Sequence, residues 1–325
     1  MALLSLIPLC KIISDATEAL SKYTSKNFGI LMMTILGNLP DLIIIGPFFF
    51  KGHSEIVHGM IIGNLVSTPL LLGAGTLIGC YKNTMLKFDE IMGQNYAYLI
   101  LFYLSIYFYS SYTNLTVSVF RFINIVFLLV YFCYLYYIFS IHPKILSKEN
   151  ESEDKSSDGS DVSIDIYDET ECLKITKYFK LNILLQLFIL VIASVIVFLV
   201  SNVMESLVED LPLSENFLLI IVLGFIGSVP EHATSINSFY KNNSDSGLNN
   251  TFGSNLMMLG GVLPIFTILE WIMNISFSVV TFSPIFILIF ITYILVYCAI
   301  LDGIAHSMEG IVLFALYILI ARILF

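Results

Sequence analysis

The sequence predicts an all-α, polytopic membrane protein with about ten transmembrane helices, arranged as two inverted five-helix repeats. Three observations lead to this fold class. The chain has 325 residues, of which 57% are hydrophobic and only 12% are charged, roughly half the charged share of a soluble domain. The apolar residues gather into segments near the roughly 20 residues that a membrane-spanning helix needs. A short acidic motif also occurs twice, at matched places in the two halves.

The segments divide the chain into a first repeat (residues 1–141), an acidic linker (142–177) and a second repeat (178–325). Each half holds five apolar segments. A linker that stays on one side of the membrane, joining two sets of five spans, inverts the second set relative to the first. The expected helices cover residues 2–20, 28–50, 54–80, 96–112, 117–141, 178–203, 215–240, 247–270, 279–301 and 306–325.

The repeated motif lies in the second segment of each half. It reads G-N-L-P-D at residues 37–41 and G-S-V-P-E at residues 227–231, so that Glu231 follows Asp41 by 190 positions. A glycine and a small polar residue follow each acid at the same spacing, in 63–64 and 253–254. A carboxylate inside an apolar span is costly and indicates function. Two such carboxylates at matched places predict a transporter whose ion site lies between the repeats.

Small polar residues surround both acids at helical spacing and predict a cation site. Their hydroxyl, amide and carboxylate oxygens suit a hard cation such as calcium. Pro40 and Pro230 predict a helix break beside each acid, although a packing kink is the simpler alternative. Gly59 and Gly63 also have a packing alternative, since small residues let helices approach closely. The candidate metal ligands are Asp41, Glu231, Asn38, Ser228, Asn64, Ser67, Thr68, Ser254 and Asn255.

The same carboxylates are the candidates for proton coupling, with His232 beside Glu231. A low dielectric favours the neutral form of an unpaired carboxylate, so an empty site takes up protons and a bound cation expels them. An intramembrane histidine is equally well explained as a hydrogen-bonded helix contact. This exchange needs no covalent chemistry, so we expect no enzyme and no cofactor, only transported calcium or another divalent cation, and protons.

The linker and the lysines predict the orientation. Ten acidic residues and one lysine lie in Glu149–Glu171, and this stretch carries nearly all of the net charge of −10. Such a segment is typical of a solvated linker. Most lysines fall on the linker side of the predicted spans, which places the linker in the cytosol and both termini on the opposite, lumenal or external, side. The expected partners are the lipid bilayer, the transported cations and, optionally, further copies of the chain, but not nucleic acid.

These motifs resemble those of the cation/proton exchanger family, the vacuolar-type calcium/proton antiporters of the calcium/cation antiporter superfamily. The first repeat there reads G-N-x-x-E-L-I and G-S-x-x-S-N-L-L-L-x-L-G, compared with G-N-L-P-D-L-I at 37–43 and G-N-L-V-S-T-P-L-L-L-G at 63–73. The second reads G-N-A-A-E-H and G-S-x-x-Q, compared with 227–232 and 253–257. The resemblance implies exchange of cytosolic calcium for lumenal protons in a vacuolar or other organelle membrane, by two repeat acids that carry both ions in turn. It also implies that this chain begins in the second helix of the family.

Four positions depart from the family pattern. Asp41 replaces a glutamate, Ser228 and Thr68 replace asparagines, and Met257 stands where the family has glutamine. Two alternatives therefore stay open: an exchanger of the same fold that uses sodium or manganese, and a degenerate membrane protein that no longer transports. A proton-translocating membrane enzyme is disfavoured, because the sequence contains no nucleotide or cofactor motif.

Overall fold

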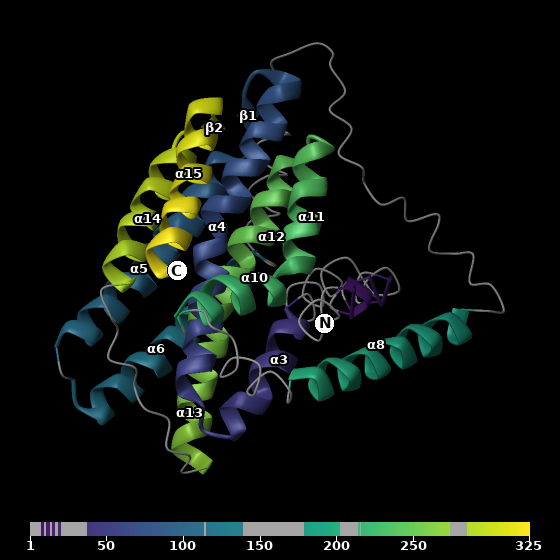
Figure 1. Ribbon diagram of the computed structural model, residues 1–325, viewed down its shortest axis with the longest axis vertical. Coiled ribbons are helices and arrows are strands. Elements are labelled where there is room, and N and C mark those ends of the chain that lie inside the picture. Colours follow the sequence, from purple (N-terminus) through teal and green to yellow (C-terminus); the bar gives the residue numbers. More distant parts are fainter. Residues whose placement is uncertain are drawn as a thin grey trace.

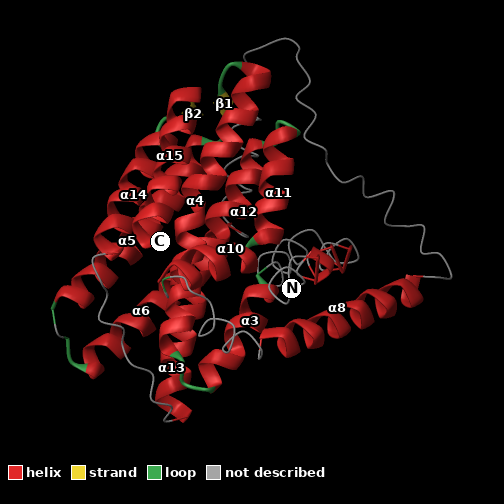
Figure 2. Ribbon diagram, in the orientation of Figure 1, coloured by secondary structure: helices red, strands yellow, loops and turns green. Residues whose placement is uncertain are grey.

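The computed structural model describes residues 8–9, 11–13, 15–16, 19–20, 38–113, 115–138, 179–201, 214, 216–273 and 285–325. Within these ranges the chain is almost entirely helical (Figures 1 and 2). The first repeat contains α3 (Leu39–Phe50), α4 (Ser54–Asn83), α5 (Glu90–Tyr112) and α6 (Val117–Tyr136). The second contains α8 (Phe179–Ser201), π-helix η3 (Phe217–Leu223), α10 (Gly224–Gly227), α11 (Val229–Tyr240), α12 (Ser244–Leu256), π-helix η4 (Met257–Val262), α13 (Leu263–Met273), α14 (Ile285–Ile300) and α15 (Ser307–Leu324).

The predicted all-α membrane fold is confirmed. Five of the described helices are long and apolar enough to cross a membrane, or six when the bent pair Phe217–Gly227 and Glu231–Tyr240 counts as one span. Two shorter apolar helices, Leu39–Phe50 and Ile287–Ile300, accompany them. The first predicted segment is described only at scattered residues, and the acidic linker lies outside the described residues.

Three predicted segments differ from the observed helices. Helix α5 begins at Glu90 instead of residue 96, because the Asp89 side chain accepts a hydrogen bond from the Met92 backbone N–H at 2.9 Å and caps the helix. The segment predicted as 215–240 is not one helix: it passes from η3 and α10 into α11 with a bend of 60°. The segment predicted as 247–270 begins earlier, at Ser244, where the Asn243 side chain accepts a hydrogen bond from the Ser246 N–H.

The two halves repeat each other at the residue level around the acidic motifs. Helices α3 and α11 each have 12 residues and stand 190 positions apart. The residues before them have the same backbone angles, with φ −89° and ψ 9° at Asn38 and φ −87° and ψ 8° at Ser228. The turns after them also match, since Gly52 has φ 80° and Asn242 has φ 61°. One local backbone conformation therefore occurs twice.

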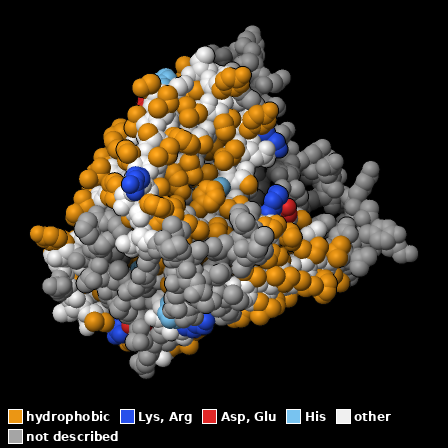
Figure 3. All heavy atoms as spheres, in the orientation of Figure 1, with side chains coloured by type: hydrophobic (Ala, Val, Ile, Leu, Met, Phe, Trp, Pro, Cys, Tyr) orange, Lys and Arg blue, Asp and Glu red, His pale blue; other side chains and the backbone are white. Residues whose placement is uncertain are grey.

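Helix α4 occupies the centre of the molecule (Figure 1). It contacts α15, α11, α12 and α3, and 78% of its membrane-spanning window is buried within the protein. The corresponding share for α8 is only 11%, and this helix lies at the periphery against α3. Hydrophobic side chains cover much of the described outer surface in Figure 3. Such a surface is stable in lipid and would be an aggregation hazard in water.

A two-stranded antiparallel pairing closes one end of the bundle. Strand β1 (Leu86–Lys87) pairs with β2 (Ile304–Ala305) and joins the loop after α4 to the loop after α14. The Phe88 N–H donates to the Gly303 carbonyl at 3.0 Å and extends this contact. The first repeat is thus tied to the last helices of the second repeat at the same end of the molecule as the tip of α11 (Figure 1).

Candidate functional site

Two helix starts place the acids of the repeated motif. In each repeat a helix begins with proline in its first two positions and has an acid in its first turn, Asp41 in α3 and Glu231 in α11. Proline is tolerated there because the first N–H groups of a helix have no intrahelical partner. The free N–H groups and the helix dipole favour a negative charge at this end. The break that the prolines predict is confirmed in the second repeat by the 60° bend.

Asp41 is enclosed between the two repeats. Its side chain is only 4% exposed, and Oδ2 accepts a hydrogen bond from Asn64 Nδ2 at 3.3 Å. The other carboxylate oxygen lies against the backbone of Gly227, where an added Cβ would stand 2.2 Å from Oδ1. No larger residue fits at Gly227 unless Asp41 moves. The carboxylate of the first repeat therefore lies beside the last residue before the helix break of the second.

A chain of buried hydrogen bonds connects the Asp41 side chain to both repeats. Asn64 Nδ2 also donates to Ser254 Oγ at 3.1 Å, and Ser254 Oγ donates to Asn38 Oδ1 at 2.5 Å. Asn64 and Ser254 are equivalent residues of the two repeats, 190 positions apart. All of these side chains are buried. The structure thus brings four candidates, Asn38, Asp41, Asn64 and Ser254, into one cluster.

Glu231 has a different environment from Asp41. Both of its carboxylate oxygens are buried, and neither has a hydrogen-bond partner in the described part of the chain. Buried polar atoms without partners are rare and costly in native proteins, and they frequently mark a functional group or an ion site. Glu231 therefore presents two buried oxygens that no described group of the protein satisfies.

His232 is buried beside Glu231, but no described hydrogen bond connects the two. Both ring nitrogens lack partners among the described residues. The ring stacks on Phe225 with centroids 4.8 Å apart and an interplanar angle of 26°. The hydrogen-bonded helix contact offered as an alternative is therefore not observed. The role of His232 in proton coupling stays a prediction.

The remaining candidates differ in how their oxygens are used. Ser228 donates to the Gly224 carbonyl at 2.9 Å, and Ser67 donates to the Asn64 carbonyl at 2.7 Å. Both hydroxyls keep lone pairs with which to bind a cation. Thr68 and Asn255 lie in a second buried network, in which Asn255 Nδ2 donates to Thr68 Oγ1 at 2.6 Å. Tyr293 completes that network through Thr68 at 3.0 Å, and the motif spacing gave no indication of this tyrosine.

Glycine contacts hold α4 against η3 and α10, as the packing alternative predicts. An added Cβ on Gly63 would stand 2.6 Å from Gly224 Cα and 2.2 Å from the Ile220 carbonyl oxygen. One on Gly59 would stand 2.6 Å from Leu219 Cβ. Helix α4 and the η3–α10 segment therefore cross with their backbones nearly in contact. This crossing brings Asn64, next to Gly63, to the interface between the repeats.

The chemistry of the site is that of oxygen donors. The described residues contain no group of three or more His, Cys, Asp or Glu side chains that could hold a metal ion. The candidate ligands brought together by the structure instead supply carboxylate, amide and hydroxyl oxygens. That set suits a hard cation and not a soft transition metal.

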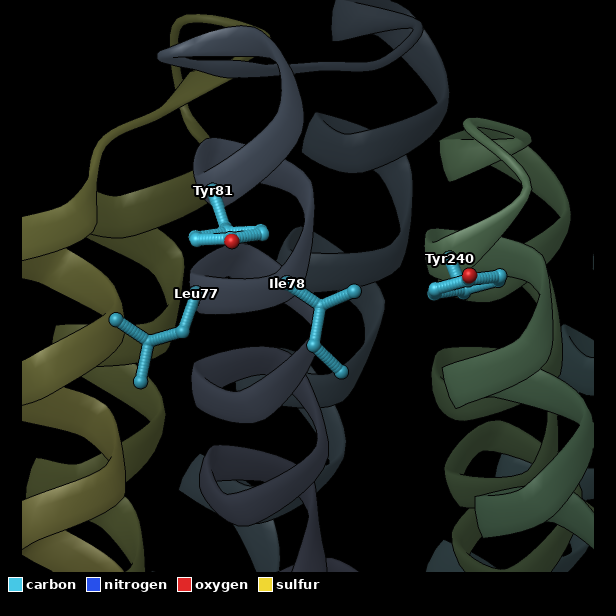
Figure 4. A pocket seen from close by; sticks show the side chains of 4 residues that line it. All are labelled: Leu77, Ile78, Tyr81 and Tyr240. Atoms are coloured by element: carbon cyan, nitrogen blue, oxygen red, sulfur yellow. The ribbon is translucent and has the colours of Figure 1, made fainter.

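A pocket of about 390 Å³ lies elsewhere, near the ends of α4 and α11 (Figure 4). Its lining consists of Leu77, Ile78, Tyr81 and Tyr240, without any of the candidate ligands. Tyr81 and Tyr240 are exposed side chains near helix ends. Tyrosines in such positions are typical of the membrane–water interface. The pocket therefore lies apart from the candidate ion site.

The fold and the paired acids define a multi-pass membrane protein of the cation-exchanger class. The comparisons give the family: the Sodium/calcium exchanger protein family matches residues 1–140 and 181–325, so the chain belongs to it. A Ca²⁺/H⁺ antiporter of Aphanothece halophytica is 28% identical over 338 residues, covering 100% of this chain and 88% of the relative. Vacuolar cation/proton exchanger 3 of Arabidopsis thaliana is 26% identical over 346 residues, covering 100% of this chain and 72% of the relative.

A solved structure supports the same architecture. The Ca²⁺/H⁺ antiporter protein YfkE superposes with a TM-score of 0.75 at 21% identity, covering 100% of this chain and 90% of that chain. At this level of identity the likeness establishes the fold. The arrangement of ten helices in two inverted repeats is consistent with these relatives.

Proposed function

We propose that this protein is a membrane antiporter that exchanges a divalent cation, calcium in the first instance, for protons by alternating access. One observation carries the proposal: Glu231 presents two buried carboxylate oxygens without a described hydrogen-bond partner, at the repeat equivalent of Asp41. The names of the relatives, a Ca²⁺/H⁺ antiporter and a vacuolar cation/proton exchanger, support calcium and protons as the two exchanged ions.

The proposed mechanism uses the two acids in turn for both ions. Deprotonated Asp41 and Glu231 hold the cation, and neutral oxygens complete its shell. Protons and the cation compete for the same carboxylates, and this mutual exclusion couples their transport. His232 is proposed to assist proton exchange. The neutral ligands are proposed to come from Asn38, Ser228, Asn64, Ser67, Thr68, Ser254 and Asn255. No cofactor takes part, since the cation is the cargo.

The proposed topology follows from the lysines and from the resemblance. The repeats comprise residues 1–141 and 178–325, and the linker 142–177 faces the cytosol while the termini face the lumen of a vacuole or another organelle. The matched backbone turns at a separation of 190 residues support the repeat boundaries. Lys51 follows α3 and Lys241 follows α11, and the two lysines would then lie on opposite sides of the membrane.

Transport by the purified protein tests the proposal. The full chain is reconstituted in liposomes, and ⁴⁵Ca²⁺ uptake is measured with an acidic interior and then with equal pH on both sides. We expect uptake that requires the pH gradient and is collapsed by a protonophore. Uptake driven by a sodium gradient instead would identify the sodium/calcium alternative. Absence of uptake under both gradients, in correctly inserted protein, would favour the degenerate alternative.

A further inference from the structure

A second buried hydrogen-bond network, beside the cluster of Asn38, Asp41, Asn64 and Ser254, involves a residue outside the repeated motifs. The Tyr293 hydroxyl of α14 lies 3.1 Å from the Leu65 carbonyl oxygen and 3.0 Å from Thr68 Oγ1. Asn255 of α12 reaches the same Thr68 oxygen through Nδ2 at 2.6 Å. All four residues are at most 1% exposed. The network therefore connects α4, α12 and α14 without solvent.

The network begins at a defect in helix α4. The Leu65 carbonyl would normally accept from the N–H four residues later, but that residue is Pro69, which lies inside the helix and has no N–H. The Tyr293 hydroxyl provides the missing donor. A buried carbonyl without a partner is costly, so this interaction is a strong local requirement and is not an incidental contact.

The proline defect sets the direction of every hydrogen bond in the network. A carbonyl can only accept, so Tyr293 uses its single hydroxyl hydrogen on Leu65. The Tyr293 oxygen then accepts from the Thr68 hydroxyl, which leaves only lone pairs on Thr68 Oγ1 for a further partner. Asn255 must therefore present its NH₂ group to Thr68, in agreement with the observed contact.

The direction of the network determines where the carboxamide oxygen of Asn255 lies. With Nδ2 held by Thr68, Oδ1 is turned away from it. This oxygen is buried and has no hydrogen-bond partner among the described residues. Asn255 directly follows Ser254, which belongs to the cluster with Asn38, Asp41 and Asn64. Its unpartnered amide oxygen is of the type that binds a hard cation.

We propose that Tyr293 is a positioning residue that acts through Thr68 to keep the Asn255 amide oxygen free for the transported cation. The inference rests on the proposed function and deepens it. In this arrangement Thr68 serves as a relay between Tyr293 and Asn255. Without the tyrosine hydroxyl, nothing fixes the direction of the Thr68 O–H, which becomes free to donate to Asn255 Oδ1. The amide would then flip and withdraw its oxygen from the cation.

The central experiment compares Tyr293→Phe with Tyr103→Phe. Both variants remove the hydroxyl of a fully buried tyrosine, but Tyr103 donates to the Phe127 carbonyl, outside the network. Calcium binding to the purified full chain is measured by equilibrium dialysis with ⁴⁵Ca²⁺, and uptake kinetics in liposomes. Loss of a residue that orients a metal ligand costs about 10–100-fold in affinity. We expect Tyr293→Phe to raise Kd and KM roughly tenfold with Vmax unchanged, and Tyr103→Phe to change neither.

A double-mutant cycle identifies the route of the effect. Asn255→Ala should raise Kd at least as much as Tyr293→Phe, and adding Tyr293→Phe to it should have no further effect, since the oxygen is already absent. Single effects that multiply in the double variant would overturn the inference. So would a Kd for folded Tyr293→Phe protein within twofold of the parent, even if its yield falls.

The same measurements separate this inference from the proposed function. Parent protein that binds calcium but fails to exchange it for protons would refute the antiporter proposal, and the Kd ratios would still decide the role of Tyr293. Parent protein that exchanges calcium while Tyr293→Phe retains the parent Kd would refute the inference alone. Absence of calcium binding by the parent protein would overturn both.

Discussion

Gly227→Ala offers a sharp test of the contact between the repeats. The added Cβ would stand 2.2 Å from Asp41 Oδ1, whereas carbon and oxygen normally approach no closer than about 3.3 Å. The carboxylate must therefore move by about 1 Å. This shift disturbs the Asn64–Asp41 hydrogen bond, which is already 3.3 Å long. The substitution thus displaces a charged ligand without removing it.

The expected magnitude follows from the displacement of a proposed metal ligand. Disturbing a residue that orients a metal ligand costs about 10–100-fold in affinity. We expect calcium binding by the purified Gly227→Ala protein to weaken about 10- to 100-fold. Alanine is the better helix former by about 1 kcal/mol, so the loss should appear in Kd and not in helix stability.

The control for this variant lies on the helix that carries Asp41. An added Cβ on Gly46 of α3 meets no atom within 4 Å, so Gly46→Ala makes the same chemical change without the steric contact. Equilibrium dialysis with ⁴⁵Ca²⁺ and thermal unfolding are measured on both variants. A Kd for Gly227→Ala within twofold of the Gly46→Ala value would refute the reasoning, because Asp41 would then not need its observed position.

Three further predictions concern the acids, the linker and the departures from the family pattern. Glu231→Gln should abolish proton-driven uptake in folded protein, while Glu231→Asp should be milder because the charge remains; normal uptake by the glutamine variant would remove Glu231 from the site. Deletion of residues 151–168 should spare exchange in liposomes, and its complete loss would show that the acidic run belongs to the transport machinery. Met257→Gln should lower the Kd for calcium by restoring an oxygen donor. Asp41→Glu should lower it further if the cation site has room for the longer side chain. An unchanged or higher Kd in Met257→Gln protein would place Met257 outside the site.

The sequence predicted the architecture and the main candidates because their signals are local. An apolar segment, a proline beside an acid and a repeat at 190 residues can each be recognised without knowing what they contact. The helix break at Ser228 is predicted by Pro230 in this way. The α5 boundary was wrong because a capping interaction of Asp89 with Met92 outweighed the composition of the first turn.

The contacts across the repeats could not be predicted from the sequence. Gly227 reads as one more small residue of a motif until the Asp41 carboxylate is seen against it. Tyr293 lies in a continuous apolar segment, 225 residues from Thr68, where an aromatic residue indicates only burial. Pro69 inside a helix predicts that the Leu65 carbonyl lacks its usual N–H donor. Only the tertiary structure shows that the Tyr293 hydroxyl replaces that donor.

The hydrogen bond between Asn64 and Ser254 joins equivalent residues, so it crosses the pseudo-twofold axis of the inverted repeats. An inward-open and an outward-open form exchange the roles of the two repeats, and an interaction on the axis is the same in both. Substitutions of this pair should therefore slow or speed both half-reactions together. Substitutions at Asp41 or Glu231 alone, whose described environments differ, can instead make the transporter favour one of the two orientations.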